Sequence, residues 1–212
     1  MTGSTRLMLV RHGRTDWNLR GRLQGSADIP LDDVGRAQAR AAARSLDGHE
    51  WDIVVTSPLA RAVETGRIIA AHLKIVVSEQ VPELAERSYG VAEGLTRADA
   101  ERRWPGGSFP GLEPLGAVAM RGVHALRSVV AAHPGGRVVV VAHGALIRAV
   151  LGELTGGPVP RIVNGALSEL EWAGRWTVHS MNRIGATTRP DAQGSPRIPV
   201  RTRGPGRDGT TG

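Results

Sequence analysis

Two apolar runs that each end in His-Gly constrain the fold of this chain more than any other feature. The first reads LMLVRHG over residues 7–13, and the second reads VVVVAHG over residues 138–144. Short runs of branched apolar residues that stop at polar residues and glycine are typical of strands buried on both faces of a parallel sheet. The pair therefore predicts two such strands, whose polar ends lie at one edge of the sheet.

The rest of the chain alternates strand-like and helix-like patterns. This predicts an α/β fold, a three-layer sandwich whose mostly parallel central sheet is flanked by helices, with a short cap segment. Asp32 is the expected N-cap of one helix, Pro58 opens another, and Thr96 with Asp99 resembles a capping box. The expected strands cover 7–10, 52–56, 75–77 and 138–142, the expected helices cover 34–46, 58–73, 115–132 and 146–154, and an edge hairpin is expected over 167–181.

Length and composition predict one domain followed by a tail. The chain has 212 residues, which suit a single domain with a substantial core. Residues 186–212 are rich in Arg, Pro, Gly and Thr and lack periodicity, so we expect them to be disordered. The predicted domain spans residues 1–185.

The charge of the chain favours an anionic ligand. The formal net charge is +7, nearly all of it from arginine, since Lys74 is the only lysine. Five of the arginines fall in the predicted tail. The positive charge that remains suits a small anion as well as a polynucleotide, and we do not expect a nucleic-acid partner.

The sequence lacks the features of several other classes of protein. It has no cysteine, which excludes disulfides, a cysteine nucleophile and a cysteine metal site. It shows neither an apolar signal core near the N-terminus nor a run of about 18 apolar residues, so we expect no export and no membrane span. A cytoplasmic protein is the default expectation.

Polar side chains follow three of the expected strands at their carboxyl ends, where ligands bind in open α/β sheets. If these strands are neighbours, Arg11, His12, Arg61 and His143 lie close together. One histidine after a strand is more often structural than catalytic, but two in equivalent positions favour a shared site. Arg61 falls in the first turn of its helix, where a cation is unfavourable unless an anion binds nearby. An exposed arginine that points away is the alternative.

Two histidines, two arginines and free amides at helix starts predict a site for a phosphoryl group. No carboxylate cluster adjoins these strand ends, so we expect neither a metal nor another cofactor. An imidazole nitrogen would be the nucleophile, and the leaving oxygen would need a proton from a carboxylic acid. Glu83, Glu86 and Glu93 are candidates for that acid, and spacing does not choose among them.

The segment RHGRTDWN, at residues 11–18, resembles the RHGxTxxN signature of the histidine phosphatase superfamily, which includes the cofactor-dependent phosphoglycerate mutases. Further segments are similar to that family in the same order, over about residues 7–183: QGSADIPLDDVGRAQA, TSPLARAVETG, ELAERSYGVAEG, PGLEPL and VVAHGALIRAVL. The resemblance implies the phosphoglycerate mutase-like fold and a covalent phosphohistidine.

The resemblance also implies a role for individual residues. His12 would be the nucleophile, Arg11 and Arg61 would hold the phosphoryl oxygens, His143 would stabilise the transition state, and Glu86 would donate the proton. Gly13 is expected to leave room for the substrate. The substrate-binding positions of the family match Asn18, Gln24, Gly25, Arg87, Tyr89 and Gly144.

Two departures bear on the reaction. ERSYG resembles the mutase branch, but the segment between Glu86 and His143 lacks the longer mutase insertion, and PGLEPL resembles the PGGES of the phosphatases. Because water that reaches a phosphohistidine hydrolyses it, we expect a metal-independent phosphatase for a small acidic phosphorylated metabolite, of phosphoglycerate or sugar phosphate type. A phosphoglycerate mutase and a non-catalytic protein that binds phospho-ligands or nucleic acid are the alternatives. The edge hairpin leaves a homodimer open.

Overall fold

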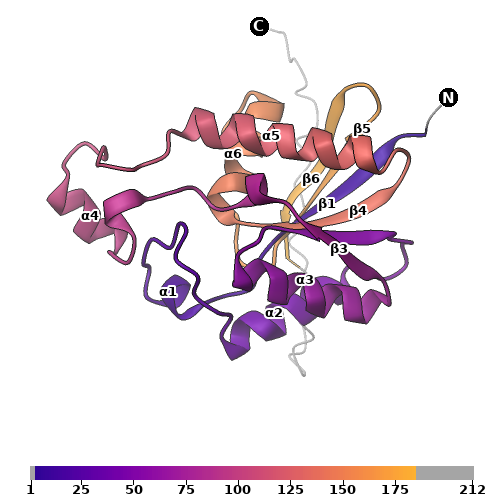
Figure 1. Cartoon of the computed structure of the whole chain (residues 1–212), viewed down its shortest axis with the longest axis horizontal. Coiled ribbons are helices and arrows are strands. Elements are labelled where there is room, and N and C mark those ends of the chain that lie inside the picture. Colours follow the sequence, from indigo (N-terminus) through magenta and orange to yellow (C-terminus); the bar gives the residue numbers. More distant parts are fainter. Residues whose placement is uncertain (1–2, 185–212) are drawn as a thin grey trace, which may run out of the picture.

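The structure, a computed structural model, describes residues 3–184 and is built around one six-stranded sheet. Figure 1 shows this sheet between two layers of helices, which confirms the expected α/β sandwich. The strand order is β3-β2-β4-β1-β5-β6. The strands are β1 (Thr5–Arg11), β2 (Ile53–Thr56), β3 (Val76–Gln80), β4 (Arg137–Ala142), β5 (Leu167–Trp172) and β6 (Trp176–Arg183).

The parallel strands end level with one another. β1 pairs in parallel with β4, β4 with β2, and β2 with β3, whereas β5 and β6 add the expected antiparallel edge hairpin. Arg11 lies opposite Ala142, and Thr56 lies opposite Val141. The residues that follow β1, β2 and β4 therefore meet at one edge of the sheet, as the two His-Gly runs predicted.

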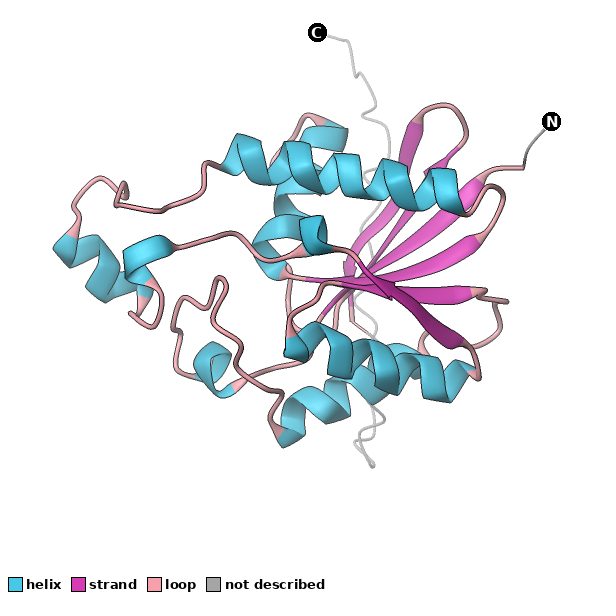
Figure 2. Cartoon of the chain, in the orientation of Figure 1, coloured by secondary structure: helices cyan, strands magenta, loops and turns pink. Residues whose placement is uncertain are grey.

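Helices α5 (Leu115–Ala132) and α6 (Gly144–Thr155) cover one face of the sheet (Figure 2). Their apolar sides pack on buried strand residues such as Leu7 and Val140, neither of which has exposed surface. The bounds of α5 match the expected helix. The two helices lie against each other at Gly122, where a side chain would overlap with Val150.

Helices α2 (Asp33–Arg44) and α3 (Ala60–Leu73) cover the other face. The Asp32 side chain accepts a hydrogen bond from the Gly35 amide, which confirms it as the N-cap of α2. Buried alanines let α2 pack closely in this layer.

Shorter elements lie beyond the carboxyl ends of the parallel strands. They are α1 (Asp16–Leu19), the 3-10 turns η1 (Pro82–Leu84) and η2 (Gly90–Ala92), and α4 (Arg97–Arg103). In Figure 1 α1 and α4 occupy the left side of the molecule. The Thr96 hydroxyl accepts from the Asp99 amide at the start of α4, as the capping pattern predicted.

The structure shifts several of the expected boundaries, most of them by one or two residues. α3 begins at Ala60 rather than at Pro58, because Leu59 has an extended backbone and its amide donates to the Ser57 hydroxyl. β3 continues to Gln80 rather than ending at residue 77. Its last residues are polar and exposed because β3 is an edge strand, so no apolar run marked them. α1 and the 3-10 turns were not expected, since each is too short to show a periodic pattern.

The predicted tail, residues 186–212, lies outside the described residues. Within residues 3–184, no helix is both long and apolar enough to cross a membrane.

Gly122 tests how tightly α5 packs on α6. Alanine normally stabilises the interior of a helix by about 1 kcal/mol relative to glycine. At this position the new methyl group would overlap with Val150 and lie 3.1 Å from Leu146 Cδ1. Overpacking of a core costs about 1–3 kcal/mol, so we expect Gly122→Ala to lower the free energy of unfolding, measured by urea titration.

Gly116→Ala is the matched control in the same helix. A Cβ atom at Gly116 meets nothing within 4 Å, so this variant should be as stable as the parent or more stable. Equal stability of the two variants would contradict the close packing of α5 on α6.

Candidate active site

A cleft of about 930 Å³ lies at the carboxyl ends of the parallel strands. Gly25 and His143 are not among the residues that line it, although both contact residues that do. Nine of the residues singled out from the sequence line the cleft together: Arg11, His12, Asn18, Gln24, Arg61, Glu86, Arg87, Tyr89 and Gly144.

Arg11 is the last residue of β1 and is 7% exposed. Its Nη1 donates to the Ile162 carbonyl at 2.7 Å, whereas its buried Nε has no partner within residues 3–184. Burial lowers the pKa of Arg11 to about 10, with a smaller contribution from the positive charge of Arg161. The guanidinium is therefore still a cation at neutral pH.

Arg61 lies in the first turn of α3 and has no exposed surface. Its Nη1 donates to the Ala27 carbonyl at 2.7 Å and its Nη2 to the Gly25 carbonyl at 2.9 Å. The buried Nε has no partner among the described residues. Burial also lowers the pKa of Arg61. The alternative that this arginine points away into solvent is wrong.

Neither Arg11 nor Arg61 forms an ion pair with a carboxylate anywhere in residues 3–184. Backbone carbonyls solvate the two cations but do not neutralise them. A buried charge is costly unless it is paired, so two such cations side by side favour a bound anion. Planar guanidinium groups suit phosphate oxygens in particular.

His12 is held in one neutral tautomer. Its Nδ1 lies 2.7 Å from the Gly13 carbonyl, which can only accept, so Nδ1 carries the ring proton and Nε2 keeps its lone pair. Burial lowers the pKa of His12 well below 6.5, and the charges of Arg11 and Arg61 lower it further. Nε2 makes no hydrogen bond to the described residues, and the His12 side chain lines the cleft.

His143 lies next to His12, with ring centroids 5.1 Å apart, and has no exposed surface. Its Nε2 is 2.7 Å from the hydroxyl of Ser57, the residue that follows β2. Its Nδ1 is buried and has no partner within the described part of the chain. Burial, together with the charge of Arg61, lowers the pKa of His143 well below 6.5.

The structure places Glu86, and neither Glu83 nor Glu93, in the cleft. The Glu86 carboxyl group accepts from the amides of Ala145 and Leu146 at the start of α6. The Glu93 carboxylate instead accepts from amides of the loop at 24–27, through Ser26 and Ala27. Glu93 thus holds the loop whose carbonyls contact Arg61.

Arg121 of α5 positions the Glu86 segment, and no sequence pattern drew attention to it. Its guanidinium donates to the carbonyls of Glu83, Ala85 and Glu86. It also forms a 2.7 Å ion pair with Glu113. An arginine in the middle of a helix is usually a surface residue, so only the folded chain identifies this one.

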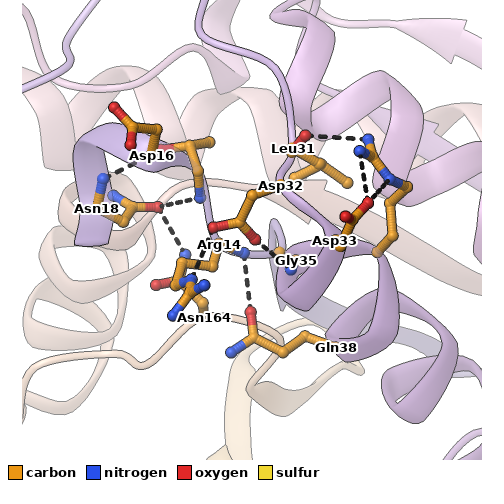
Figure 3. A network of polar contacts seen from close by, with 12 residues as sticks. Arg14, Asp16, Asn18, Leu31, Asp32, Asp33, Gly35, Gln38 and Asn164 are labelled. Atoms are coloured by element: carbon orange, nitrogen blue, oxygen red, sulfur yellow. Dashed lines mark hydrogen bonds and ion pairs between the residues drawn. The ribbon is translucent and has the colours of Figure 1, made fainter. Parts of the chain in front are cut away.

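A network of side chains fixes Asn18 at the cleft (Figure 3). The Asn18 Oδ1 accepts from the Thr15 amide and from Asn164 Nδ2, which leaves the Asn18 Nδ2 as a donor toward the cleft. Asn164 Nδ2 also donates to the His12 carbonyl at 3.1 Å. In the same network Arg14 forms an ion pair with Asp32, which ties the loop after β1 to α2. Asn164 lies outside the segments that suggested the site.

The glycines after the two histidines have different roles. Gly13 was expected to leave room for the substrate, and this expectation is wrong. A Cβ atom at Gly13 would overlap with the backbone of Gly35, so the residue lets the loop after β1 lie against α2. At Gly144 a Cβ atom would lie 3.0 Å from Arg11 Nε, so this glycine makes space for a side chain of the cleft.

Two arginines near the cleft differ in their surroundings. Arg87 lines it, with Nε 2.7 Å from the Glu113 carbonyl and its guanidinium carbon 5.7 Å from the centroid of the Tyr89 ring. Burial raises the pKa of Tyr89, which keeps its hydroxyl protonated at neutral pH. Arg102 instead pairs with Asp99 on the exposed side of α4 and does not line the cleft.

No group of three or more His, Asp or Glu side chains in residues 3–184 is placed to hold a metal ion.

The buried neutral histidines predict a stability that depends on pH. In the unfolded chain a histidine takes up a proton near pH 6.5, whereas in the folded chain His12 and His143 do so only at lower pH. The unfolded state therefore binds more protons below pH 6.5. Stability is complete above that pH and falls by up to about 1.4 kcal/mol per pH unit for each histidine as the pH decreases.

Urea unfolding at pH 7.5 and pH 5.5 measures this loss. His12→Gln and His143→Gln each remove one of the two groups, so the loss should be smaller in either variant than in the parent chain. An identical loss in all three proteins would contradict the assignment.

Asn164→Asp tests the network around Asn18. An aspartate places an oxygen where Asn164 Nδ2 now donates to two oxygen atoms, and it adds a negative charge near the cleft. We expect kcat/KM for p-nitrophenyl phosphate to fall about tenfold or more, since hydrogen bonds to charged or buried groups are worth about 1.5–3 kcal/mol. Asn164→Ala, which adds no charge, should retain more activity. Full activity in Asn164→Asp would exclude this positioning role.

Comparison with known proteins identifies the family. Residues 7–184 match the model of the histidine phosphatase superfamily (branch 1). The chain is 40% identical over 183 residues to the uncharacterized phosphatase PhoE of Bacillus subtilis, covering 84% of this chain and 94% of that protein. It is 37% identical over 163 residues to a 2,3-bisphosphoglycerate-dependent phosphoglycerate mutase of Gloeobacter violaceus, covering 70% of this chain and 74% of that one.

A solved structure agrees with these matches. The native structure of a mycobacterial glucosyl-3-phosphoglycerate phosphatase superposes with a TM-score of 0.76 at 30% identity, covering 84% of this chain and 99% of the other. The resemblance drawn from the six sequence segments is confirmed. The chain belongs to the histidine phosphatase superfamily, branch 1.

Proposed function

We propose that the chain is a metal-independent phosphomonoesterase that hydrolyses a small acidic phosphorylated metabolite through a phosphohistidine at His12. One observation carries the proposal. A neutral imidazole with a free Nε2 lies beside two buried arginines that form no ion pair with a carboxylate of residues 3–184. This arrangement suits a dianionic phosphoryl group and an attacking nitrogen.

In the first half of the reaction the phosphoryl group binds between Arg11 and Arg61, whose free Nε–H groups and remaining guanidinium protons donate to its oxygens. Nε2 of His12 attacks phosphorus and forms the P–N bond while the P–O ester bond breaks. The leaving oxygen takes a proton from Glu86, which enters this step as the carboxylic acid.

In the second half a water molecule attacks the phosphohistidine. Glu86, now a carboxylate, takes a proton from this water as the P–N bond breaks. Inorganic phosphate leaves, and His12 returns to its neutral form with the proton still on Nδ1. His143 lies beside His12, where its buried Nδ1 can donate to a phosphoryl oxygen when it carries the ring proton.

Access to water favours hydrolysis over mutase chemistry. Exposed arginine side chains border the cleft, and Arg87, Tyr89 and Arg97 are its lining residues from the segment 87–114. A phosphoenzyme in such a cleft is open to attack by water. The relatives include proteins named as phosphatases and proteins named as mutases, so a phosphoglycerate mutase is the second candidate. The cytoplasmic location, a homodimer and the absence of a nucleic-acid partner stay predictions.

Phosphate release in EDTA is the test. We expect the parent chain to release phosphate from at least one acidic phosphomonoester, and His12→Ala to release none, because the nucleophile is gone. EDTA should not change the rate. A rate that falls in EDTA and recovers with a divalent metal would contradict metal independence, and interconversion of 2- and 3-phosphoglycerate without phosphate release would favour the mutase.

Glu86→Gln tests the proton donor. A glutamine cannot protonate a poor leaving group, so its kcat/KM should fall about a hundredfold or more for an alkyl phosphate. For p-nitrophenyl phosphate, whose leaving group needs no proton, the fall should be much smaller. Equal losses on both esters would assign Glu86 a different role.

A further inference from the structure

One wall of the cleft is formed by α6 and by the connection from α6 to β5. This wall carries two arginines that the proposed hydrolysis does not use. Arg148 extends from α6, one turn after the helix start that receives Glu86. Arg161 extends from the connection between α6 and β5. Both side chains are exposed and both line the cleft.

The connection that carries Arg161 is fixed in place. Arg148 Nε donates to the Val159 carbonyl at 3.0 Å, and Arg11 donates to the Ile162 carbonyl at 2.7 Å. Asn182 of β6 donates from Nδ2 to the Arg161 carbonyl at 3.1 Å and accepts at Oδ1 from the amide of Val163. The backbone of Arg161 is therefore held on both sides relative to the phosphoryl pocket.

The charge on this wall is not neutralised by its surroundings. Neither Arg148 nor Arg161 forms an ion pair with another of residues 3–184. The wall has one acidic side chain, Glu153, which is exposed and likewise unpaired within the described residues. The charge of Arg161 contributes to the lowered pKa of Arg11, so the two guanidinium groups lie within electrostatic reach of each other.

We propose that Arg148 and Arg161 form a second anion subsite, which binds a carboxylate or phosphate group on the leaving part of the substrate. This inference rests on the proposed hydrolysis. A substrate whose phosphoryl group lies between Arg11 and Arg61 extends its leaving group along the cleft, and the wall that carries Arg161 is joined to Arg11 through Ile162. The subsite favours phosphorylated acids over neutral phosphate esters.

The cleft has three further arginines outside the phosphoryl pocket. Arg87 donates through Nε to the Glu113 carbonyl, and its guanidinium lies over Tyr89. Arg22 donates to the Gly94 carbonyl. Arg97 lies at the start of α4 and also lines the cleft. Like Arg148 and Arg161, it forms no ion pair within residues 3–184, so Arg97 serves as the control in the experiment.

The test compares 3-phosphoglycerate with glycerol 3-phosphate, which differ only in a carboxylate that replaces a hydroxymethyl group. The parent chain should have the higher kcat/KM on 3-phosphoglycerate. Arg161→Gln should reduce the ratio of the two kcat/KM values about tenfold or more, since one charge-assisted hydrogen bond is lost. Arg148→Gln should reduce the ratio as well.

Two controls separate the subsite from general charge effects. Arg175→Gln removes an exposed charge at the turn between β5 and β6 and should leave both kcat/KM values unchanged. Arg97→Gln removes a charge from the α4 side of the cleft and should leave the ratio unchanged.

An unchanged ratio in Arg161→Gln overturns the subsite, and so does a reduced ratio found only in Arg97→Gln. Hydrolysis of p-nitrophenyl phosphate that requires His12, with no preference for 3-phosphoglycerate in the parent chain, overturns the subsite but leaves the proposed hydrolysis intact. Failure of the parent chain to release phosphate from any ester overturns the proposed hydrolysis itself, and the subsite with it.

Discussion

The site depends on two buried guanidinium groups that form no ion pair with a carboxylate of the described residues. Arg11 and Arg61 lie at the carboxyl edge of the sheet, with carbonyl groups as their only hydrogen-bond partners in residues 3–184. Burying such cations is unfavourable, and the rest of the site reduces that cost with the carbonyls of Gly25, Ala27 and Ile162. The loops that supply these carbonyls must in turn be held, by Glu93 for one loop and by Asn182 for the other.

The positive charges of Arg11 and Arg61 also affect the protonation state of the two histidines. His12 and His143 are buried beside the arginines, and both burial and charge disfavour their protonation. In the proposed reaction His12 therefore needs no neighbouring base, because the Gly13 carbonyl fixes its tautomer and the positive charge nearby keeps Nε2 unprotonated. Glu86, whose carboxyl group accepts from amides at the start of α6, is the acid of the proposed reaction and lines the same cleft.

Local patterns in the sequence predicted the layers of the fold and the place of the site. The apolar runs identified β1 and β4, and their parallel pairing brought Arg11, His12 and His143 together as expected. Periodicity located α5, whose bounds the structure reproduces. These features can be predicted because strand and helix patterns depend on residues that are neighbours along the chain.

Contacts between distant segments could not be predicted in the same way. Asn164 donates to the His12 carbonyl, although the two residues are 152 positions apart in the sequence. Arg121 of α5 donates to the Glu86 carbonyl, and no sequence pattern drew attention to this arginine. Gly13 was assigned to the substrate, but its neighbour is the backbone of Gly35, which only the folded chain brings into contact. Sequence spacing also left Glu83, Glu86 and Glu93 equivalent, and the start of α6 distinguishes them in the structure.

A trapping experiment addresses the covalent step directly. The enzyme is mixed with a substrate that carries radioactive phosphorus, the reaction is stopped in base within milliseconds, and the labelled peptide is identified by mass spectrometry. A label on His12 that is stable in base, is released by acid, and appears before inorganic phosphate is the predicted result. A label on any other residue, or phosphate release without a labelled enzyme at any time, would contradict catalysis through His12.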